Sequence, residues 1–292
     1  RGENMDFLVE NAIKGSSNSE AKYEGLIGEA KIRVIGVGGS GNNMVGWLYN
    51  KGVKGAEILA CNTDKQHLDM IDADRKFLIG KSITKGLGCG GFPEKGAESA
   101  KESMQELKDC LKGSDMVFVC AGMGGGTGTG AAPVIARVAK DTGSIVIGTV
   151  TMPFKIERAR VDKAEYGLQQ LRSVADTVIV IDNNRLVKIA GNLPIQQAFA
   201  VANELVATMI KGIVETIAVP SLVNLDYADV KAIMTNGGVA AIGVGSSDTN
   251  NRVEEAVRGA LQNPLLDINY TGATGALIHV IGGPDMTLDE IN

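Results

Sequence analysis

The chain has 292 residues, of which 44% are hydrophobic and 22% charged, and its formal net charge is −5. This length exceeds an ordinary single domain and predicts two domains or one large one. The negative charge and the lack of any block of Lys or Arg exclude the usual electrostatic basis of nucleic-acid binding, so we expect no DNA or RNA partner.

Four cysteines lie at irregular spacings without a C-x-x-C pair, and the sequence has two histidines. A zinc site is therefore not expected. The N-terminal residues show no apolar signal region, and no charge-free run approaches the roughly 20 residues of a membrane span. We expect a cytoplasmic protein with reduced cysteines and without direct insertion into a membrane.

Residues 1–30 mix small, polar and charged residues, which predicts a loosely attached N-terminal extension. From Lys31 onward, short apolar runs alternate with amphipathic segments. The runs are KIRVIGVGG, AEILACNTD, RKFLIG, DMVFVCAGM, SIVIGTVTM and DTVIVIDNN. Buried strands that alternate with helices indicate an α/β fold with a mostly parallel sheet covered on both faces, here assigned to residues 31–194.

The longest predicted helix covers residues 195–219, where apolar residues recur at intervals of three and four. We expect it to pack centrally, because Glu204, Lys211 and Glu215 argue against a membrane span. Residues 220–292 are predicted to form a smaller α/β domain. Its elements are helices near 227–235 and 251–262 and strands at GVAAIGVGSS and GALIHVIGG.

A first glycine loop, GVGGSGNN, follows the first strand and has the G-x-G-x-x-G spacing at Gly36, Gly38 and Gly41. This spacing is typical of dinucleotide-binding folds, and Asp64 has the sequence position of their ribose-binding acid. One hypothesis is therefore an NAD(P)-dependent Rossmann oxidoreductase. The alternative for this loop alone is a tight structural turn.

A second glycine loop, AGMGGGTGTGAAP, follows a later strand at residues 121–133. Glycines let successive backbone N–H groups face one anion, and the helix predicted from near Ala131 adds its positive dipole. Thr127 and Thr129 offer hydroxyl donors, and Pro133 suits a first helical turn. Two such loops favour a ligand with more phosphate than one dinucleotide carries, bound chiefly by backbone because no P-loop lysine motif occurs.

At these residues the sequence resembles the tubulin and FtsZ superfamily of GTPases, most closely the FtsZ family. Six motifs occur in the family's order between Lys31 and Asn292: GVGGSGNN, ACNTDKQHL, AGMGGGTGTGAAP, PFKIERAR, AFAVANEL and NLDYADVK. The resemblance implies a GTPase that binds GTP, GDP and Mg²⁺. It also implies a chain that ends before the last strands of the family's C-terminal domain, so we expect a partial chain.

The resemblance assigns the nucleotide to five groups of residues. Gly38, Gly39, Ser40, Gly41, Asn42 and Asn43 would lie along the phosphates and toward the base. Gly124, Gly125, Gly126, Thr127, Gly128, Thr129 and Gly130 would wrap the β- and γ-phosphates. Glu157 and Arg160 would reach the ribose, Phe199 would stack on guanine, and Asn183 and Asn203 would bind its edge.

Two of these assignments stay open on the residues alone. Phe199 is equally compatible with core packing on the long helix. The family usually reads E-G-x-x-R, whereas Glu157 is followed here by Arg158 and then Arg160, so either arginine is a candidate for the nucleotide contact.

The residues for hydrolysis are expected in NLDYADVK, where Asp226 and Asp229 are the acids and Asn224 precedes them. A helix cap with acid in the first turn is the alternative for these residues. In the family this segment serves the GTP of the next subunit, which implies head-to-tail homopolymers and a division ring. Membrane-adaptor proteins would bind regions outside this sequence. Besides the Rossmann oxidoreductase, a second alternative is a filament protein of the same superfamily that serves cell shape or DNA segregation.

Overall fold

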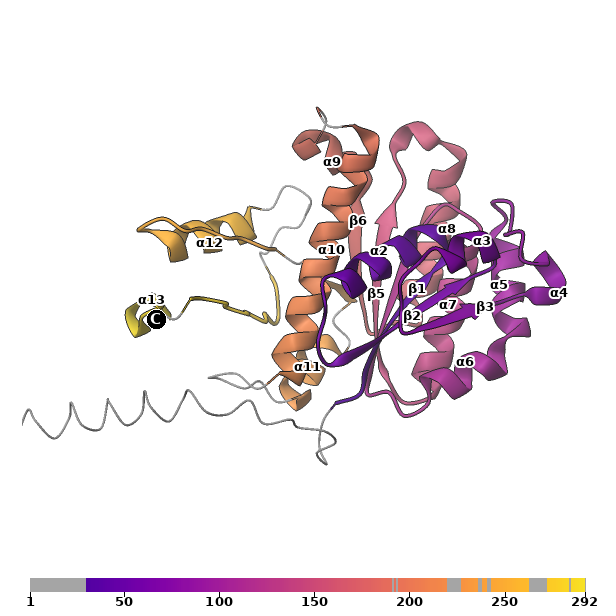
Figure 1. The fold of residues 1–292 in the computed structure, drawn as a ribbon, viewed down its shortest axis with the longest axis horizontal. Helices are drawn as coiled ribbons and strands as arrows, with labels where there is room; N and C mark the ends of the chain where they lie inside the picture. The colour runs from indigo at the N-terminus through magenta and orange to yellow at the C-terminus, as the bar shows by residue number, and fades with distance from the viewer. Residues whose placement is uncertain are drawn as a thin grey trace, which may run out of the picture.

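A computed structural model describes residues 30–190, 192, 194–219, 227–235, 238–240, 243–262, 272–283 and 285–291 (Figure 1). The predicted N-terminal extension lies outside the described residues except for Ala30. Asn224 and Asp226 also lie outside them, whereas Asp229 is described.

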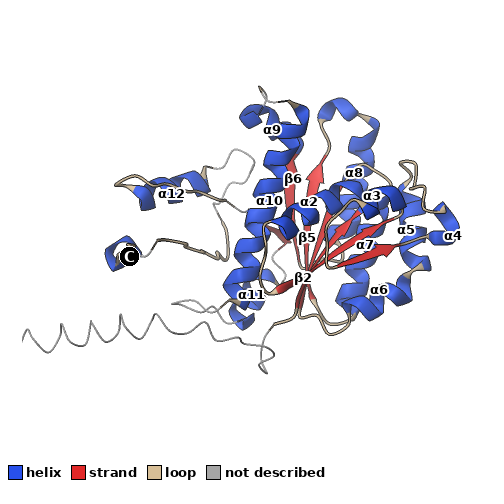
Figure 2. Cartoon of the chain, in the orientation of Figure 1, coloured by secondary structure: helices blue, strands red, loops and turns tan. Residues whose placement is uncertain are grey.

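The described strands form a seven-stranded sheet with the order β3-β2-β1-β4-β5-β6-β7. Figure 2 shows the strands surrounded by helices. Every pair of neighbouring strands is parallel. The six predicted runs coincide with the first six strands, which confirms the α/β prediction. The strands are β1 (Ile32–Val37), β2 (Ala56–Asn62), β3 (Arg75–Leu78), β4 (Met116–Gly122), β5 (Ile145–Met152), β6 (Thr177–Asp182) and β7 (Gly238–Ala240).

Helices cover both faces of the sheet, and neighbouring residues of one strand point to opposite cores. The helices are α2 (Gly38–Asn50), α3 (Lys65–Asp69), α4 (Lys81–Thr84), α5 (Pro93–Glu102), α6 (Met104–Leu111), α7 (Thr127–Asp141), η1 (Lys155–Glu157), α8 (Ala159–Arg172), α9 (Asn183–Ala190), α10 (Ile195–Ala218), α11 (Tyr227–Met234), α12 (Arg252–Leu261) and α13 (Leu288–Ile291). Ile35 of β1 packs in the core beneath α5, α6, α7 and α8. Its neighbour Val34 packs in the opposite core, beneath α2, α10 and α11.

The predicted long helix is confirmed as α10. Val206, Ile210 and Val214 are completely or almost completely buried against the sheet and α2. Within the described part of the chain, α10 is also the one helix whose length and composition would suit a membrane crossing, a property that buried helices of folded proteins share. Phe199 does not join this core, because its side chain is 39% exposed.

The start of α7 differs from the prediction. The helix begins at Thr127 rather than near Ala131, because the Gly130 N–H already donates to the Gly126 carbonyl at 3.0 Å. Pro133 therefore lies inside the helix and not in its first turn. Having no N–H, it leaves the Thr129 carbonyl without the usual helical partner.

The last quarter of the chain matches the predicted helices and the beginning of one predicted strand, but not the other predicted strand. α11 and α12 are confirmed, whereas GVAAIGVGSS contributes the three residues of β7, which extend the main sheet beside β6. The segment 275–283 forms no strand. A strand needs a neighbour for its backbone N–H and C=O groups, and none of the described strands lies beside this segment.

Candidate functional site

Both glycine loops lie at the carboxyl edge of the sheet, where parallel folds hold their ligands. The first follows β1 and the second follows β4, the neighbour of β1. A Cβ atom added to Gly38 would lie 2.8 Å from the backbone nitrogen of Gly128, and one added to Gly122 would lie 2.5 Å from the Ser40 Cβ. The two loops are therefore in direct contact.

The first loop divides into an exposed part and a buried part. Gly38 has a left-handed φ of 73° and starts α2, while Ser40 and Asn43 are exposed and Gly39 is half-buried. Gly41 packs against β4, since an added Cβ would lie 2.2 Å from the Cys120 carbonyl oxygen. Asn42 is fully buried and accepts a hydrogen bond from the Cys61 N–H at 3.2 Å, so its side chain turns toward β2.

Most glycines of the second loop are needed for close packing. Added Cβ atoms would lie 2.6 Å from the Cys89 Cβ at Gly126, 2.6 Å from the Gly122 carbonyl oxygen at Gly128, and 1.8 Å from the Pro93 carbonyl oxygen at Gly130. Gly125 is different, because an added Cβ would meet no atom within 4 Å. Its backbone therefore borders open space at the site.

The two threonine hydroxyls form hydrogen bonds within the protein. Thr127 Oγ1 lies 2.7 Å from Thr63 Oγ1, and Thr129 Oγ1 accepts a hydrogen bond from the Gly124 N–H at 2.9 Å. Gly124 itself has a left-handed φ of 100°. The hydroxyls predicted as ligand donors thus fix the conformation of the loop.

A third glycine loop, which the sequence analysis missed, packs against the second. Gly86, Gly88, Gly90 and Gly91 all have left-handed φ values, between 60° and 83°. The segment reaches the site through Cys89, next to Gly126, and through Pro93, next to Gly130. Four glycines within KGLGCGG were the available signal for this loop.

The turn after β5 lies beside the second loop. The Glu157 carboxylate accepts from the Phe154 N–H at 3.0 Å and pairs with the Arg160 guanidinium at 2.8 Å. A Cβ added to Gly124 would lie 2.8 Å from the Arg160 carbonyl oxygen. Arg158 has a φ of 29°, which side chains rarely adopt, and it follows Glu157 as glycine does in E-G-x-x-R.

A ring and two amides lie where α9 packs on α10. Phe199 contacts Phe154 edge to face, with ring centroids 5.8 Å apart. The Asn183 side chain is buried, and its Oδ1 has no hydrogen-bond partner. Leu186 packs against Ala202, which brings the first turn of α9 toward the Phe199–Asn203 turn of α10. An unpartnered buried carbonyl on α9 and an exposed ring on the adjoining helix α10 fit a planar ligand with N–H donors on its edge.

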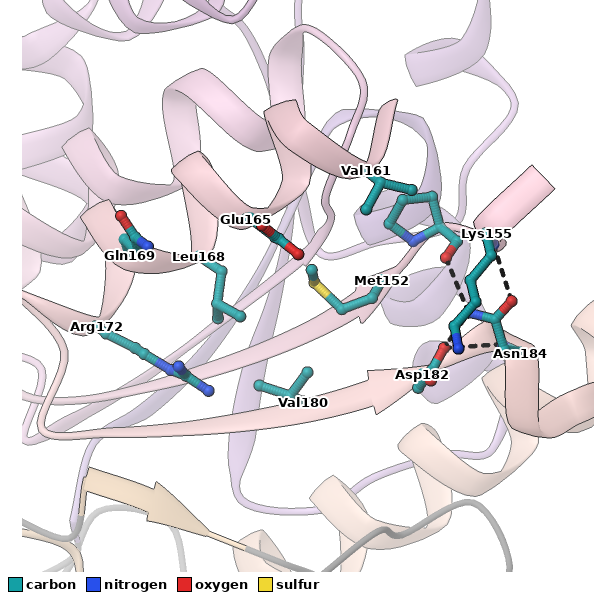
Figure 3. Close-up of a pocket in the computed structure, with 11 residues that line it drawn as sticks. Met152, Lys155, Val161, Glu165, Leu168, Gln169, Arg172, Val180, Asp182 and Asn184 are labelled. Carbon is teal, nitrogen blue, oxygen red and sulfur yellow. Dashed lines mark hydrogen bonds between the residues drawn. The ribbon is translucent and has the colours of Figure 1, made fainter. Parts of the chain in front are cut away.

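Asn184, also missed from the sequence, joins the turn after β5 to the start of α9. Its Oδ1 accepts from the Lys155 N–H at 2.9 Å, and its Nδ2 donates to Asp182 Oδ1 at 2.6 Å (Figure 3). These residues border a hollow of about 460 Å³ between α8 and β6, with Val161, Leu168 and Val180 among its apolar lining. The hydrogen bonds of Asn184 fix the two segments that carry Glu157 and Asn183.

Asp229 lies at the other end of the sheet. It is exposed in the first turn of α11, where the neighbouring Tyr227 hydroxyl donates to the Asp115 carbonyl at 2.8 Å, just before β4 begins. Thr177, the first residue of β6, donates to the Met234 carbonyl at the end of α11. α11 thus contacts the amino ends of the strands, whereas the glycine loops follow their carboxyl ends (Figure 1).

Two other expectations concern acids and metals. Asp64 does not act as a free ribose acid, because its carboxylate caps α3 by accepting from the His67 N–H at 3.1 Å. Among the described residues, no group of three or more His, Cys, Asp and Glu side chains is arranged to hold a metal ion. All four cysteines are buried, and burial raises the pKa of the Cys120 thiol to about 12.

Comparisons with known proteins agree with this geometry. Residues 31–191 match the model of the Tubulin/FtsZ family, GTPase domain, and residues 238–292 match that of the FtsZ family, C-terminal domain. The chain is 56% identical to Cell division protein FtsZ 2 of Methanocaldococcus jannaschii, over 98% of this chain and 76% of that protein.

Two solved structures extend the comparison to assemblies. An empty FtsZ dimer from M. jannaschii superposes with a TM-score of 0.86 at 48% identity, covering 96% of this chain and 80% of that one. A GTPγS-bound protofilament of CetZ2 from Haloferax volcanii gives a TM-score of 0.68 at 26% identity, covering 78% and 70%.

Proposed function

Because the chain belongs to the FtsZ branch of the tubulin/FtsZ family of GTPases, we propose that it binds GTP between its glycine loops and hydrolyses it within head-to-tail filaments. GTP would enter one subunit at the carboxyl edge of the sheet. The segment with Asp226 and Asp229 of the next subunit would complete the site.

The observation that carries this proposal is the separation of the two halves of the site. The glycine loops follow the carboxyl ends of β1 and β4, while α11, with Asp229, contacts the segments at the amino ends of β4 and β6. Between them runs α10, whose 24 residues correspond to about 36 Å at 1.5 Å per residue. Asp229 of one subunit would therefore act on the nucleotide of a neighbour.

Within one subunit, the residues at the carboxyl edge would bind GTP as follows. Backbone N–H groups near Gly39 and Gly125 and the positive end of α7 would bind the phosphates. Phe199 would contact the base, and the unpartnered Asn183 Oδ1 would accept from the N1 and N2 groups of guanine. Arg160 would approach the ribose beside Gly124.

Hydrolysis would need little covalent participation from the protein. Asp226 and Asp229 would orient a water for in-line attack on the γ-phosphorus, the bond to the GDP oxygen would break, and the water proton would pass toward phosphate or carboxylate. Mg²⁺ would neutralise phosphate charge. With no acidic cluster among the described residues, its ligands would be mainly phosphate oxygens and water, as is usual for this ion.

Such chemistry couples assembly to hydrolysis. A head-to-tail contact joins two different surfaces and generates filaments when its rotation does not close. The relatives are named cell division proteins, which supports a role in division. We propose that the filaments would form a cytoplasmic division ring, which adaptor proteins would link to the membrane. A filament for cell shape or DNA segregation is the alternative, and cellular localisation distinguishes the two. A Rossmann oxidoreductase is not supported, because the GTPase-domain match includes GVGGSGNN and Asp64 caps α3.

Phosphate release measured against protein concentration, with sedimentation of the same samples, tests the proposal. We expect the rate per subunit to rise with concentration as sedimentable polymer appears. NADH oxidation is the control for the rival function. A constant rate per subunit from dilute monomer to polymer would contradict the shared site, and absence of GTP turnover would contradict the GTPase assignment.

A further inference from the structure

Glu204 stands at the crossing of α2 and α10. Its Oε2 accepts a hydrogen bond from Trp47 Nε1 at 2.6 Å, and its Oε1 pairs with Lys51 Nζ at 2.5 Å. Trp47 is in the last turn of α2, and Lys51 follows that helix directly. Hydrogen bonds from Lys51 and Trp47 hold the pKa of Glu204 below its ordinary value, so this carboxylate is ionised at neutral pH.

Further contacts continue from Glu204 along α10. Lys211 Nζ donates to the Lys51 carbonyl at 3.0 Å, and the Lys54 N–H donates to Glu215 Oε1 at 3.2 Å. Gly55, with a left-handed φ of 89°, lies so close to Ala218 that an added Cβ would be 2.1 Å from the alanine Cβ. We call these contacts, from Glu204 to Ala218, the α2–α10 seam.

The seam joins the two helices that carry opposite ends of the proposed nucleotide site. α2 begins at Gly38 in the first glycine loop. α10 carries Phe199 and Asn203 immediately before Glu204. Apolar contacts between the helices resist separation but, being non-directional, resist sliding less than charged hydrogen bonds do.

We propose that Glu204 is a positioning residue that sets the axial register of α10 against α2, and thereby holds Phe199 and Asn203 at the distance from the phosphate loops that a guanine nucleotide requires. This inference rests on the proposed nucleotide site. It assigns Glu204 a role in base binding, without direct contact to the ligand.

Paired titrations test this role, because GTP uses the phosphate loops and the α10 residues, whereas inorganic tripolyphosphate uses the phosphate loops alone. Each is titrated against a bound fluorescent GDP analogue. For Glu204→Ala we expect the Kd for GTP to rise about three- to tenfold, which corresponds to the loss of one or two modest contacts. The Kd for tripolyphosphate should not change. Glu204→Gln keeps an acceptor for Trp47, so its Kd for GTP should lie between those of the unmodified chain and of Glu204→Ala.

Trp47→Phe separates positioning from general stability. It removes the indole donor but keeps a ring. Added to Glu204→Ala, it should raise the Kd for GTP little further, because both substitutions remove the same hydrogen bond between Trp47 and Glu204. Glu254→Ala is the matched control, since it breaks an exposed ion pair with Arg258 at 2.6 Å on α12. It should leave both Kd values unchanged.

The outcomes distinguish this inference from the proposed function. Equal losses for GTP and tripolyphosphate in folded Glu204→Ala and Glu204→Gln proteins, or no loss for either ligand, would overturn the positioning role while leaving a GTP-binding protein. Failure of the unmodified chain to bind GTP would instead overturn the proposed function.

Discussion

At the scale of single residues, the structure separates two roles of glycine that look alike in GGGTGTG. Gly126, Gly128 and Gly130 allow close packing, whereas Gly125 borders open space. A substitution at Gly125 therefore probes ligand binding, and one at Gly128 probes folding. Periodicity and spacing could not separate them, because the difference depends on which segments pack against the loop.

For Gly125→Val we expect an unchanged melting temperature and GTP binding weakened roughly tenfold or more, because the side chain would fill the space of a phosphate whose charge-assisted hydrogen bonds are strong. For Gly128→Ala we expect about 1–3 kcal/mol of destabilisation, since its Cβ would overlap the Gly122 carbonyl. Thermal unfolding and equilibrium binding check both variants. Normal GTP affinity in a folded Gly125→Val protein would contradict the proposal that the backbone at Gly125 binds a phosphate of GTP.

Asn183 gives a second test at this scale. Its buried Oδ1 has no partner, so Asn183→Ala removes no internal hydrogen bond of that atom and should change the free energy of unfolding by less than about 1 kcal/mol. GTP affinity should fall about tenfold, and ITP, which lacks the 2-amino group, should lose less. Equal losses for the two nucleotides would argue that Asn183 does not read the base edge.

At the scale of elements, hydrophobic runs predicted β1–β6 and the long helix correctly, because a buried parallel strand is apolar along most of its length. The start of α7 and the strand at GALIHVIGG were predicted wrongly for a shared reason. Thr127–Gly130 become helical through backbone bonds that composition does not reveal, and a strand at 275–283 would depend on a neighbour. Glu157, Phe199 and Asn183 could be selected from a family resemblance, whereas Asn184 and Glu204 are visible only through their contacts.

Two interior strands of the sheet, β4 and β2, carry buried thiols whose ionisation should destabilise the sheet. Burial raises the pKa of Cys120 on β4 to about 12 and also raises that of Cys61 on β2. A raised folded-state pKa means that the thiol's contribution is complete below the unfolded value near 9 and is lost as the pH rises toward 12. Each thiol should lower the free energy of unfolding by up to about 1.4 kcal/mol per pH unit in that window.

Chemical denaturation of the unmodified chain and Cys120→Ala between pH 8.5 and 11 checks this expectation. Tyrosines and lysines titrate in both proteins, so the difference in slope isolates the thiol. The variant should lose stability less steeply. Parallel pH dependences would contradict the contribution of Cys120.

At the scale of the whole molecule, the central claim is that nucleotide and catalytic acids belong to different subunits of one filament. The described part of the chain has the geometry for this division, with the glycine loops and α11 at opposite ends of the strands. A consequence is that two differently defective proteins could restore one another, which a self-contained active site would not allow.

Mixing Asp226→Ala/Asp229→Ala protein with Gly125→Val protein tests this claim most directly. The first should bind GTP but hydrolyse almost none, and the second should keep its acids but bind GTP poorly. Together they can form junctions in which a loaded pocket meets intact acids, so phosphate release should rise well above the sum of the separate proteins. Sedimentation of the mixture shows whether both chains enter polymer. Mixed polymers that contain both chains and release no more phosphate than their parts would contradict catalysis between subunits.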